Sequence, residues 1–159
     1  MGELHVVMPL NDLGDFSDAQ RVSSWLRSLG IACPTAQGRY PTLQELRAVL
    51  DHLDGFTVRY STGPEHWSAD IVEEGRGGCA GDGESTYDWA YLVVGNFHND
   101  ETRPQSVYFD PGAPRLMLMI LRRLAAVCGP QLLLPTGGEL PVVVTADLDV
   151  ESTLTTWPS

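Results

Sequence analysis

Two apolar segments constrain the fold of this chain more than any other feature of the sequence. Residues 89–97, WAYLVVGNF, are apolar on both faces, a pattern typical of a strand at the centre of a sheet. Residues 115–128 follow Pro114, precede Gly129-Pro130 and are apolar almost all round in their first half, which predicts a buried helix. We expect this helix to lie across the sheet, or partly in an oligomer interface. Four side chains should then be mostly buried: Leu92, Val93, Ile120 and Leu124.

Local patterns predict two further helices and several strands. One helix should end near Leu29, with Val22, Trp25, Leu26 and Leu29 on one apolar face. The other should begin with a capping box formed by Thr42 and Glu45. Strands are predicted at 4–8, 56–61, 67–72, 107–109, 131–134 and 140–144. The resulting order, β-α-α-β-β-β-β-α-β-β, lacks the alternation of parallel α/β folds.

We therefore predict a single α+β domain over residues 1–159. Its sheet should be mixed or largely antiparallel, with about three helices mainly on one face. Residues 73–88, EEGRGGCAGDGESTYD, contain five acidic residues and five glycines, which predicts a flexible, solvated loop between two strands. Residues 145–159 are mostly polar and acidic, and we expect them to fray.

The charge balance excludes several classes of function. The chain has 21 acidic and 10 basic residues, a net charge of −11. Nucleic-acid phosphates and anionic membranes require clustered Lys or Arg, so neither is an expected partner. Such a charge either steers the chain toward a basic protein or only keeps it soluble. Because the N-terminus lacks a basic start and no apolar run is long enough to span a membrane, we expect a cytoplasmic location.

The sequence contains no recognisable catalytic or cofactor motif. The glycine cluster at 75–83 leads into a strand rather than a helix and has no lysine, so it does not fit a phosphate-binding loop. The histidines form no HExxH pattern, and the three cysteines form no CxxC pair. Cys79 lies in the acidic loop near Arg76. We expect no cofactor, no metal and no catalytic residue.

The best candidates for partner binding surround the acidic loop. Acidic side chains beside tryptophan and tyrosine are suited to anchoring a basic protein. Region 56–113 holds 10 acids and 3 bases, a net charge of −7, so most of the excess charge lies there. The alternative is that the tryptophans pack in the core. The predicted partner-binding residues are Glu73, Glu74, Asp82, Glu84, Asp88, Trp67 and Tyr87.

A second hypothesis is a small enzyme or ligand-binding domain whose site is assembled from distant residues. Its best candidates are His98, Asp100 and Asp110, because polar side chains leave the end of a predicted central strand there.

Two stretches carry a family resemblance: residues 39–60, RYPTLQELRAVLDHLDGFTVRY, and residues 105–144, QSVYFDPGAPRLMLMILRRLAAVCGPQLLLPTGGELPVVV. In their order of helix and strand signals they resemble small bacterial domains of the toxin-immunity or accessory kind. The resemblance implies a non-enzymatic protein that neutralises a basic partner, such as a toxin, by covering its active surface.

Overall fold

Seven strands form one sheet in the computed structural model, which describes residues 4–10, 24–34, 36–74, 88–95, 97–137 and 139–157. The strands lie in the order β2-β3-β4-β5-β1-β6-β7, and each neighbouring pair is antiparallel. Their bounds are β1 His5–Pro9, β2 Phe56–Thr62, β3 Trp67–Glu73, β4 Trp89–Gly95, β5 Ser106–Gly112, β6 Gln131–Pro135 and β7 Val142–Val144. The predicted α+β class with a largely antiparallel sheet is therefore confirmed.

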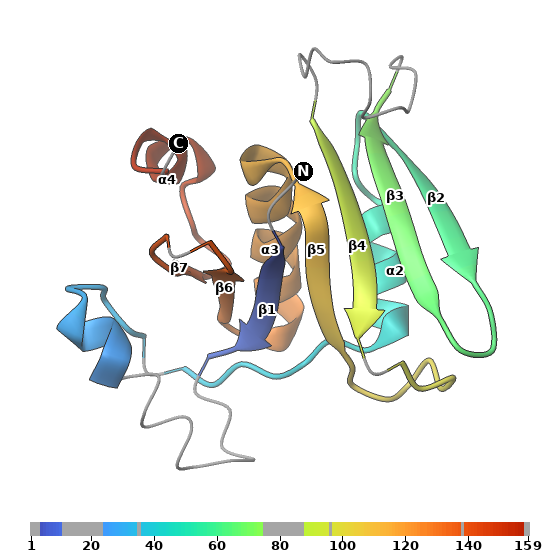
Figure 1. Cartoon of the computed structure of the whole chain (residues 1–159), viewed down its shortest axis with the longest axis horizontal. Helices are drawn as coiled ribbons and strands as arrows, with labels where there is room; N and C mark the ends of the chain where they lie inside the picture. Colours follow the sequence, from blue (N-terminus) through green and yellow to red (C-terminus); the bar gives the residue numbers. More distant parts are fainter. Residues whose placement is uncertain are drawn as a thin grey trace.

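Three labelled helices complete the fold: α2 Leu43–Asp51, α3 Pro114–Cys128 and α4 Val150–Thr155. Figure 1 shows α2 and α3 behind the sheet. A short helical segment at 24–28 lies apart from them and packs Leu26 against Leu10 and Leu132. Of its predicted apolar face, Leu26 is buried, but Trp25 and Leu29 are 44% and 37% exposed. Val22 lies outside the described residues.

The main core lies between the sheet and the helices α2 and α3. Along α3, Leu116, Met117, Leu118, Ile120 and Leu121 are each 0% exposed. They pack with residues of every strand from β3 to β7 and with leucines of α2. Burial of each such side chain contributes about 1.5–3 kcal/mol relative to leaving it in water. The predicted helix across the sheet is confirmed.

Two expectations need correction. Leu92, Ile120 and Leu124 are buried, but Val93 is only half-buried, because the alternation of β4 places it on the face of the sheet turned away from α3. The strand predicted at 89–97 is an interior strand, with β5 at the middle of the order. Residues 145–157 include α4, capped by a bond from the Ser152 N–H to Asp149, and the fraying expected of this tail stays a prediction.

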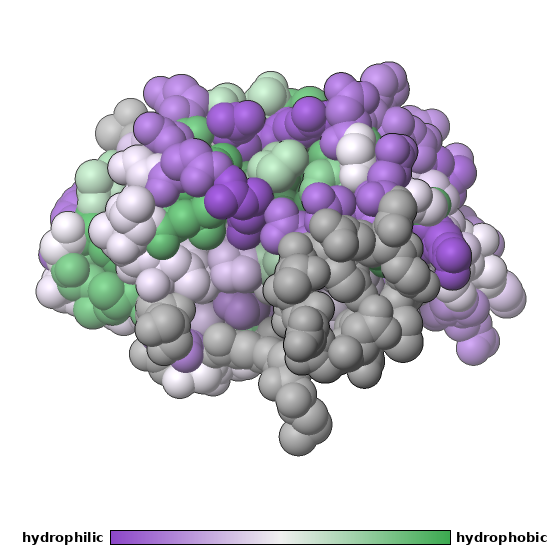
Figure 2. Space-filling view, turned by 90° about the horizontal axis from the view of Figure 1, so that it is seen from above, coloured by the Kyte–Doolittle hydropathy of each residue, from purple (hydrophilic) through white to green (hydrophobic). Residues whose placement is uncertain are grey.

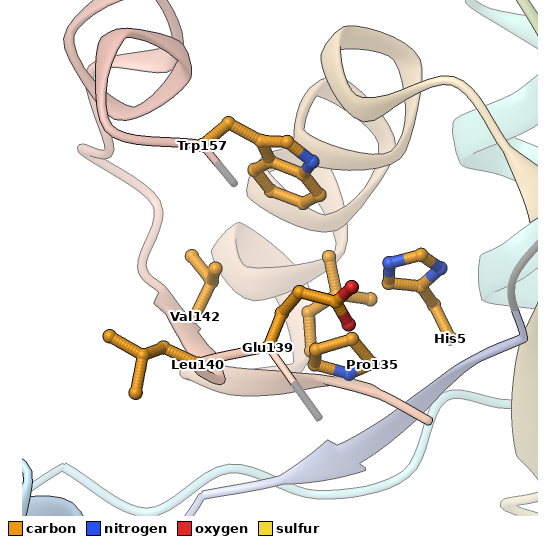
Figure 3. A pocket seen from close by; sticks show the side chains of 7 residues that line it. His5, Pro135, Glu139, Leu140, Val142 and Trp157 are labelled. Carbon is orange, nitrogen blue, oxygen red and sulfur yellow. The ribbon is translucent and has the colours of Figure 1, made fainter. Parts of the chain in front are cut away.

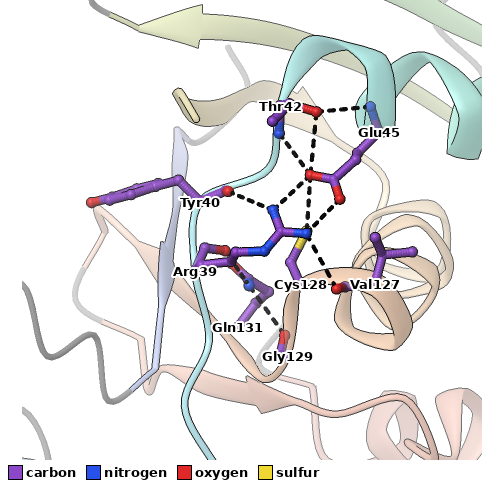
Figure 4. A network of polar contacts seen from close by, with 8 residues as sticks. All are labelled: Arg39, Tyr40, Thr42, Glu45, Val127, Cys128, Gly129 and Gln131. Atoms are coloured by element: carbon purple, nitrogen blue, oxygen red, sulfur yellow. Dashed lines mark hydrogen bonds and ion pairs between the residues drawn. The ribbon is translucent and has the colours of Figure 1, made fainter. Parts of the chain in front are cut away.

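An ion pair joins the linker before α2 to the first turn of α2, and hydrogen bonds from the same arginine, Arg39, tie that linker to the end of α3 (Figure 4). Arg39 donates two hydrogen bonds to the Glu45 carboxylate, at 2.7 and 2.5 Å. Glu45 also accepts from the Thr42 N–H, and Thr42 Oγ1 accepts from the Glu45 N–H, so the predicted capping box is present. The Arg39 N–H donates to the Cys128 carbonyl at 2.8 Å, and Gln131 donates to the Arg39 carbonyl at 3.0 Å.

Two glycines permit this close approach. A Cβ on Gly38 would lie 2.1 Å from the Pro130 oxygen. Gly129 has a φ of +80°, and a Cβ there would lie 2.4 Å from the Gln37 oxygen. Both positions therefore exclude a side chain, because the two backbones are in contact. We call the set of contacts made by Arg39, Glu45 and Gln131 the linker latch.

The latch changes the acidity of its members. The hydrogen bonds from Arg39 lower the pKa of Glu45 from 4.5 to about 2. Burial, followed by the nearby Glu45 charge, raises the pKa of the Cys128 thiol to about 11. Cys128 is therefore a protonated, inert core side chain at neutral pH.

We expect Leu124→Ala to lower the free energy of unfolding by about 2–5 kcal/mol, because it empties a fully packed position under the sheet. Val127→Ala is the matched control, since Val127 lies on the same helix but is 51% exposed. It should change stability by less than about 0.5 kcal/mol. Chemical denaturation measures both, and similar small effects would place this face of α3 outside the core.

The latch also predicts a pH dependence. The folded-state pKa of Glu45 lies below its ordinary value, so its contribution is complete above pH 4.5 and is lost as the pH falls toward 2. We expect Glu45→Gln to cost about 1 kcal/mol at pH 7, allowing for solvent screening of the half-exposed Arg39, and to flatten the stability curve between pH 4.5 and 2. Glutamine can still serve the capping box.

The control for this experiment is Glu65→Gln, an exposed change with no ion pair among the described residues. Its stability should follow that of the wild type at every pH. If the two variants give the same curve, the Arg39–Glu45 pair contributes nothing to the acid dependence.

Candidate binding surface

The face of strands β2 to β5 that points away from the helices is the most distinctive surface of the described chain. In β4, Ala90, Leu92 and Val94 are buried toward α3, so the residues between them point to the opposite side. The same alternation in β5 turns Val107 and Phe109 inward. In Figure 1 no described helix crosses this side of the four strands. We call it the open face.

Aromatic and polar side chains occupy the open face. Trp89, Tyr91, Val93 and Tyr108 are half-buried there. The Trp89 indole donates a 2.6 Å hydrogen bond to Asp70 on β3, and the Tyr91 hydroxyl donates to Ser68 at 3.2 Å. These cross-strand bonds fix the two rings against the sheet.

Tyr108 lies beside Gly95 of the neighbouring strand. A Cβ on Gly95 would lie 3.6 Å from its ring, so the ring lies across the glycine of the neighbouring strand. Trp89 and Tyr91 are therefore held in position before any partner arrives, with Tyr108 beside them. Little side-chain entropy remains to be lost when they are covered.

Carboxylates gather where β3 ends and β4 begins. The Glu73 N–H donates to the Asp88 carbonyl at 3.2 Å, so the two residues lie side by side. Burial raises the pKa of Asp88, Arg115 at 4.0 Å opposes the rise, and Glu73 adds to it. Arg115 is shared, because it also pairs with Glu151. Figure 2, which views this end of the sheet, shows hydrophilic residues over much of the described surface, with apolar ones between them.

The predicted partner-binding residues fall into three groups. Glu73, Glu74 and Asp88 lie at the rim just described, with Glu74 exposed. Asp82, Glu84 and Tyr87 lie outside the described residues, as do Cys79 and the rest of residues 75–87 of the predicted flexible loop. Trp67 is 2% exposed and packs against Tyr60, with ring centroids 5.5 Å apart. Its position fits the alternative interpretation, a tryptophan packed in the core.

The residues of the second hypothesis do not converge. His98 and Asp100 lie in the exposed loop between β4 and β5, and the hydroxyl and N–H of Thr102 lower the pKa of Asp100 by hydrogen bonding. Asp110 lies four residues beyond Ser106, where that loop ends. Four residues of strand span about 13 Å, so Asp110 belongs to the opposite end of β5.

The described residues offer neither a metal centre nor a cavity of ligand size beside His5. Within the described ranges, no group of three or more His, Cys, Asp or Glu residues could hold a metal ion, and no helix is long and apolar enough to cross a membrane. A small cavity near His5, Glu139 and Trp157 (Figure 3) has a volume of about 20 Å³. That space holds one water molecule rather than an organic ligand.

Comparison with known proteins gives no match to a family model, to a curated protein or to a solved structure. The candidate surface therefore depends on its geometry alone. Sequence reasoning missed Asp70, Tyr91 and Tyr108. In WAYLV, aromatic residues with a polar tip alternate with aliphatic ones, a pattern that indicates one buried and one exposed face. The interpretation of this segment as apolar on both faces overlooked that alternation.

A double-mutant cycle tests the architecture of the open face. We expect Trp89→Phe and Asp70→Asn each to lower the free energy of unfolding, because each removes one partner of a 2.6 Å bond to a carboxylate. The double variant should lose about 1 kcal/mol less than the sum of the two single losses. Additive losses would mean that the two side chains do not interact across the strands.

Proposed function

We propose that this chain is a non-enzymatic protein-binding domain that binds a basic protein partner through the open face, in the manner of an immunity protein that neutralises a toxin. The observation that carries the proposal is the set of three aromatic rings, Trp89, Tyr91 and Tyr108, on a sheet face without a covering layer among the described elements; hydrogen bonds hold the first two. Tyrosine and tryptophan dominate the energetics of protein interfaces.

Charge supports a basic partner. The open face carries Asp70, and the exposed Asp110 extends the same strand pattern. Glu73, Glu74 and Asp88 lie at the end of the sheet where β3 meets β4, with Asp88 turned toward Arg115 on the helix side. Arg59, which is opposite Asp70 in the strand register, is the basic residue of β2 on the open face. A cationic surface would meet complementary charge around an aromatic centre, which speeds encounter and fixes orientation.

The size of the face bears on how the partner would sit. Four strands about 4.8 Å apart and seven residues long give an area of about 450 Å². Stable complexes bury about 800 Å² on each partner. A partner centred on the aromatic rings would therefore also cover the acidic rim, where the predicted partner-binding residues Asp82 and Glu84 follow in sequence.

Capture with matched baits tests the proposal. The wild-type chain, a Tyr91→Ser/Tyr108→Ser variant and a Val127→Ser control are immobilised and exposed to lysate of the source organism. We expect a basic protein to be retained by the wild type and the control but lost with the double variant, since Val127 lies on the helix side of the sheet. Equal retention by all three baits would exclude the open face.

Kinetics with the captured protein tests the acidic rim. Neutralising Glu73, Glu74, Asp82, Glu84 and Asp88 together should slow association and weaken its dependence on salt, because rim charges act mainly on the on-rate. The free energy of unfolding should change little. Association at the wild-type rate across all salt concentrations would show that the rim does not steer the partner.

A further inference from the structure

Strand β2 forms one edge of the sheet and lacks the features that usually protect such an edge. It pairs with β3 through seven consecutive residues without a bulge, and no described element lies beyond it (Figure 1). Its sequence, FTVRYST, contains no proline and no lysine, and its one charge is Arg59. The strand at the opposite edge, β7, has only three residues. Because short strands, prolines, lysines and bulges are the common means of blocking an edge, β2 is left able to pair.

Two hydrogen bonds identify the backbone groups of β2 that point outward. The Glu74 N–H donates to the Gly55 carbonyl at 2.8 Å, and the Gly63 N–H donates to the His66 carbonyl at 3.0 Å. Both pairs fit the register of β2 on β3, so the odd-numbered residues between them direct their N–H and C=O groups toward β3. The groups at the free edge are therefore those of Phe56, Val58, Tyr60 and Thr62. No hydrogen bond from a described residue reaches them.

The same even-numbered positions carry the apolar side chains of β2. Phe56, Val58 and Tyr60 pack against the main core but remain half-buried. Thr57 and Arg59, which alternate with them on the open face, are exposed. A further strand at this edge would bury the apolar row and satisfy the outward backbone groups in one step.

The register shows that a second copy of β2 fits this edge. In an antiparallel pair of identical strands, a two-fold axis passes through one residue, and outward groups face outward groups. An axis at Arg59 would place two guanidinium groups directly opposite each other, and an axis at Tyr60 would leave Phe56 beyond the end of the other strand. An axis at Val58 instead places Phe56 of each copy opposite Tyr60 of the other. It also places Arg59 opposite Thr57, so that no two charges of the strand face each other.

We propose that β2 pairs with β2 of a second copy of this chain, antiparallel about an axis at Val58, to give one continuous sheet of fourteen strands. The net charge of −11 on each copy opposes this pairing, but the strand itself carries no acidic residue. The pairing uses the strand edge rather than the open face, so it does not depend on the proposed basic partner.

The pairing would enlarge the open face. Because the two-fold axis is perpendicular to the sheet, both helix layers lie on one side and both open faces on the other. Two faces of about 450 Å² each then form one surface of about 900 Å². This area matches the roughly 800 Å² that each side of a stable complex buries.

Cysteine cross-linking tests the register. The variants are made in a Cys33→Ser/Cys79→Ser chain, in which the buried Cys128 is the only other thiol. Val58→Cys places the two Cα atoms about 5.5 Å apart, within the range of a disulfide. Thr57→Cys, the matched control, places them about 7–8 Å apart, which is too far. We expect a mild oxidant to give a covalent dimer with Val58→Cys and at most about a tenth as much with Thr57→Cys.

Analytical ultracentrifugation measures the pairing without a cross-link. The dimer fraction of the wild type should rise with concentration up to about 1 mM. It should not fall as salt is added, because screening reduces the repulsion between two acidic chains. Val58→Pro removes one outward N–H and leaves the bonds to β3 in place, so it should keep the fold and prevent the dimer. Val127→Ser, at an exposed position of α3, should dimerise as the wild type does.

Three results would overturn the proposal: a wild type that stays monomeric up to about 1 mM, a folded Val58→Pro that dimerises like the wild type, or equal cross-linking by the two cysteine variants. If the wild type is monomeric and Val58→Pro loses the captured basic protein, the edge binds a strand of that protein instead. If Val58→Pro does not fold, the comparison of Val58→Cys with Thr57→Cys decides.

Discussion

The burial of α3 is the constraint on which the rest of this structure depends. A helix with eight buried residues needs cover on several sides, and it obtains this from the sheet, from α2 and from α4. The helices that share its core therefore gather on its side of the sheet. Strands β2 to β5 keep a second face that no described helix covers. The open face is therefore a consequence of the burial of α3 against the opposite side of the sheet.

Besides the packing of α2 on α3, the linker latch connects these two helices through polar contacts. Arg39 reaches residues 88 and 92 positions away, at Val127 and Gln131, while Glu45 lies in the first turn of α2. The start of one helix is thereby tied to the end of the other. Because α2 carries Arg47, the latch also sets the position of one wall of an open cleft lined by Leu43, Arg47 and Trp67. The fold thus places a flat aromatic surface and this cleft on different parts of one sheet.

Local sequence patterns predicted α3 and the capping box because every interaction that defines them lies within a few residues. The faces of the strands could not be assigned in the same way. Trp67 and Trp89 each stand at the start of a predicted strand, so their local sequences look similar. Trp67 nevertheless lies in the core and Trp89 on the open face, because the face that each side chain takes depends on the pairing register with distant strands. Likewise, His98 and Asp110 are close in sequence but are separated by the length of a strand. The sequence therefore predicted the carboxylates near this surface, Glu73, Glu74 and Asp88, but it did not predict the open-face residues Asp70, Tyr91 and Tyr108.

The place of β1 carries a consequence for how the chain is made. This first strand lies inside the sheet, where His5 faces Phe109 on one side and Pro135 on the other. Both neighbours are synthesised more than 100 residues later, so β1 has no sheet to join until most of the chain has left the ribosome. Contacts this distant slow folding and prolong the exposure of apolar strands. Loss of the first ten residues would remove a strand from inside the sheet and so divide it into two parts. β5 and β6 would then become edge strands with unpaired backbone N–H and C=O groups.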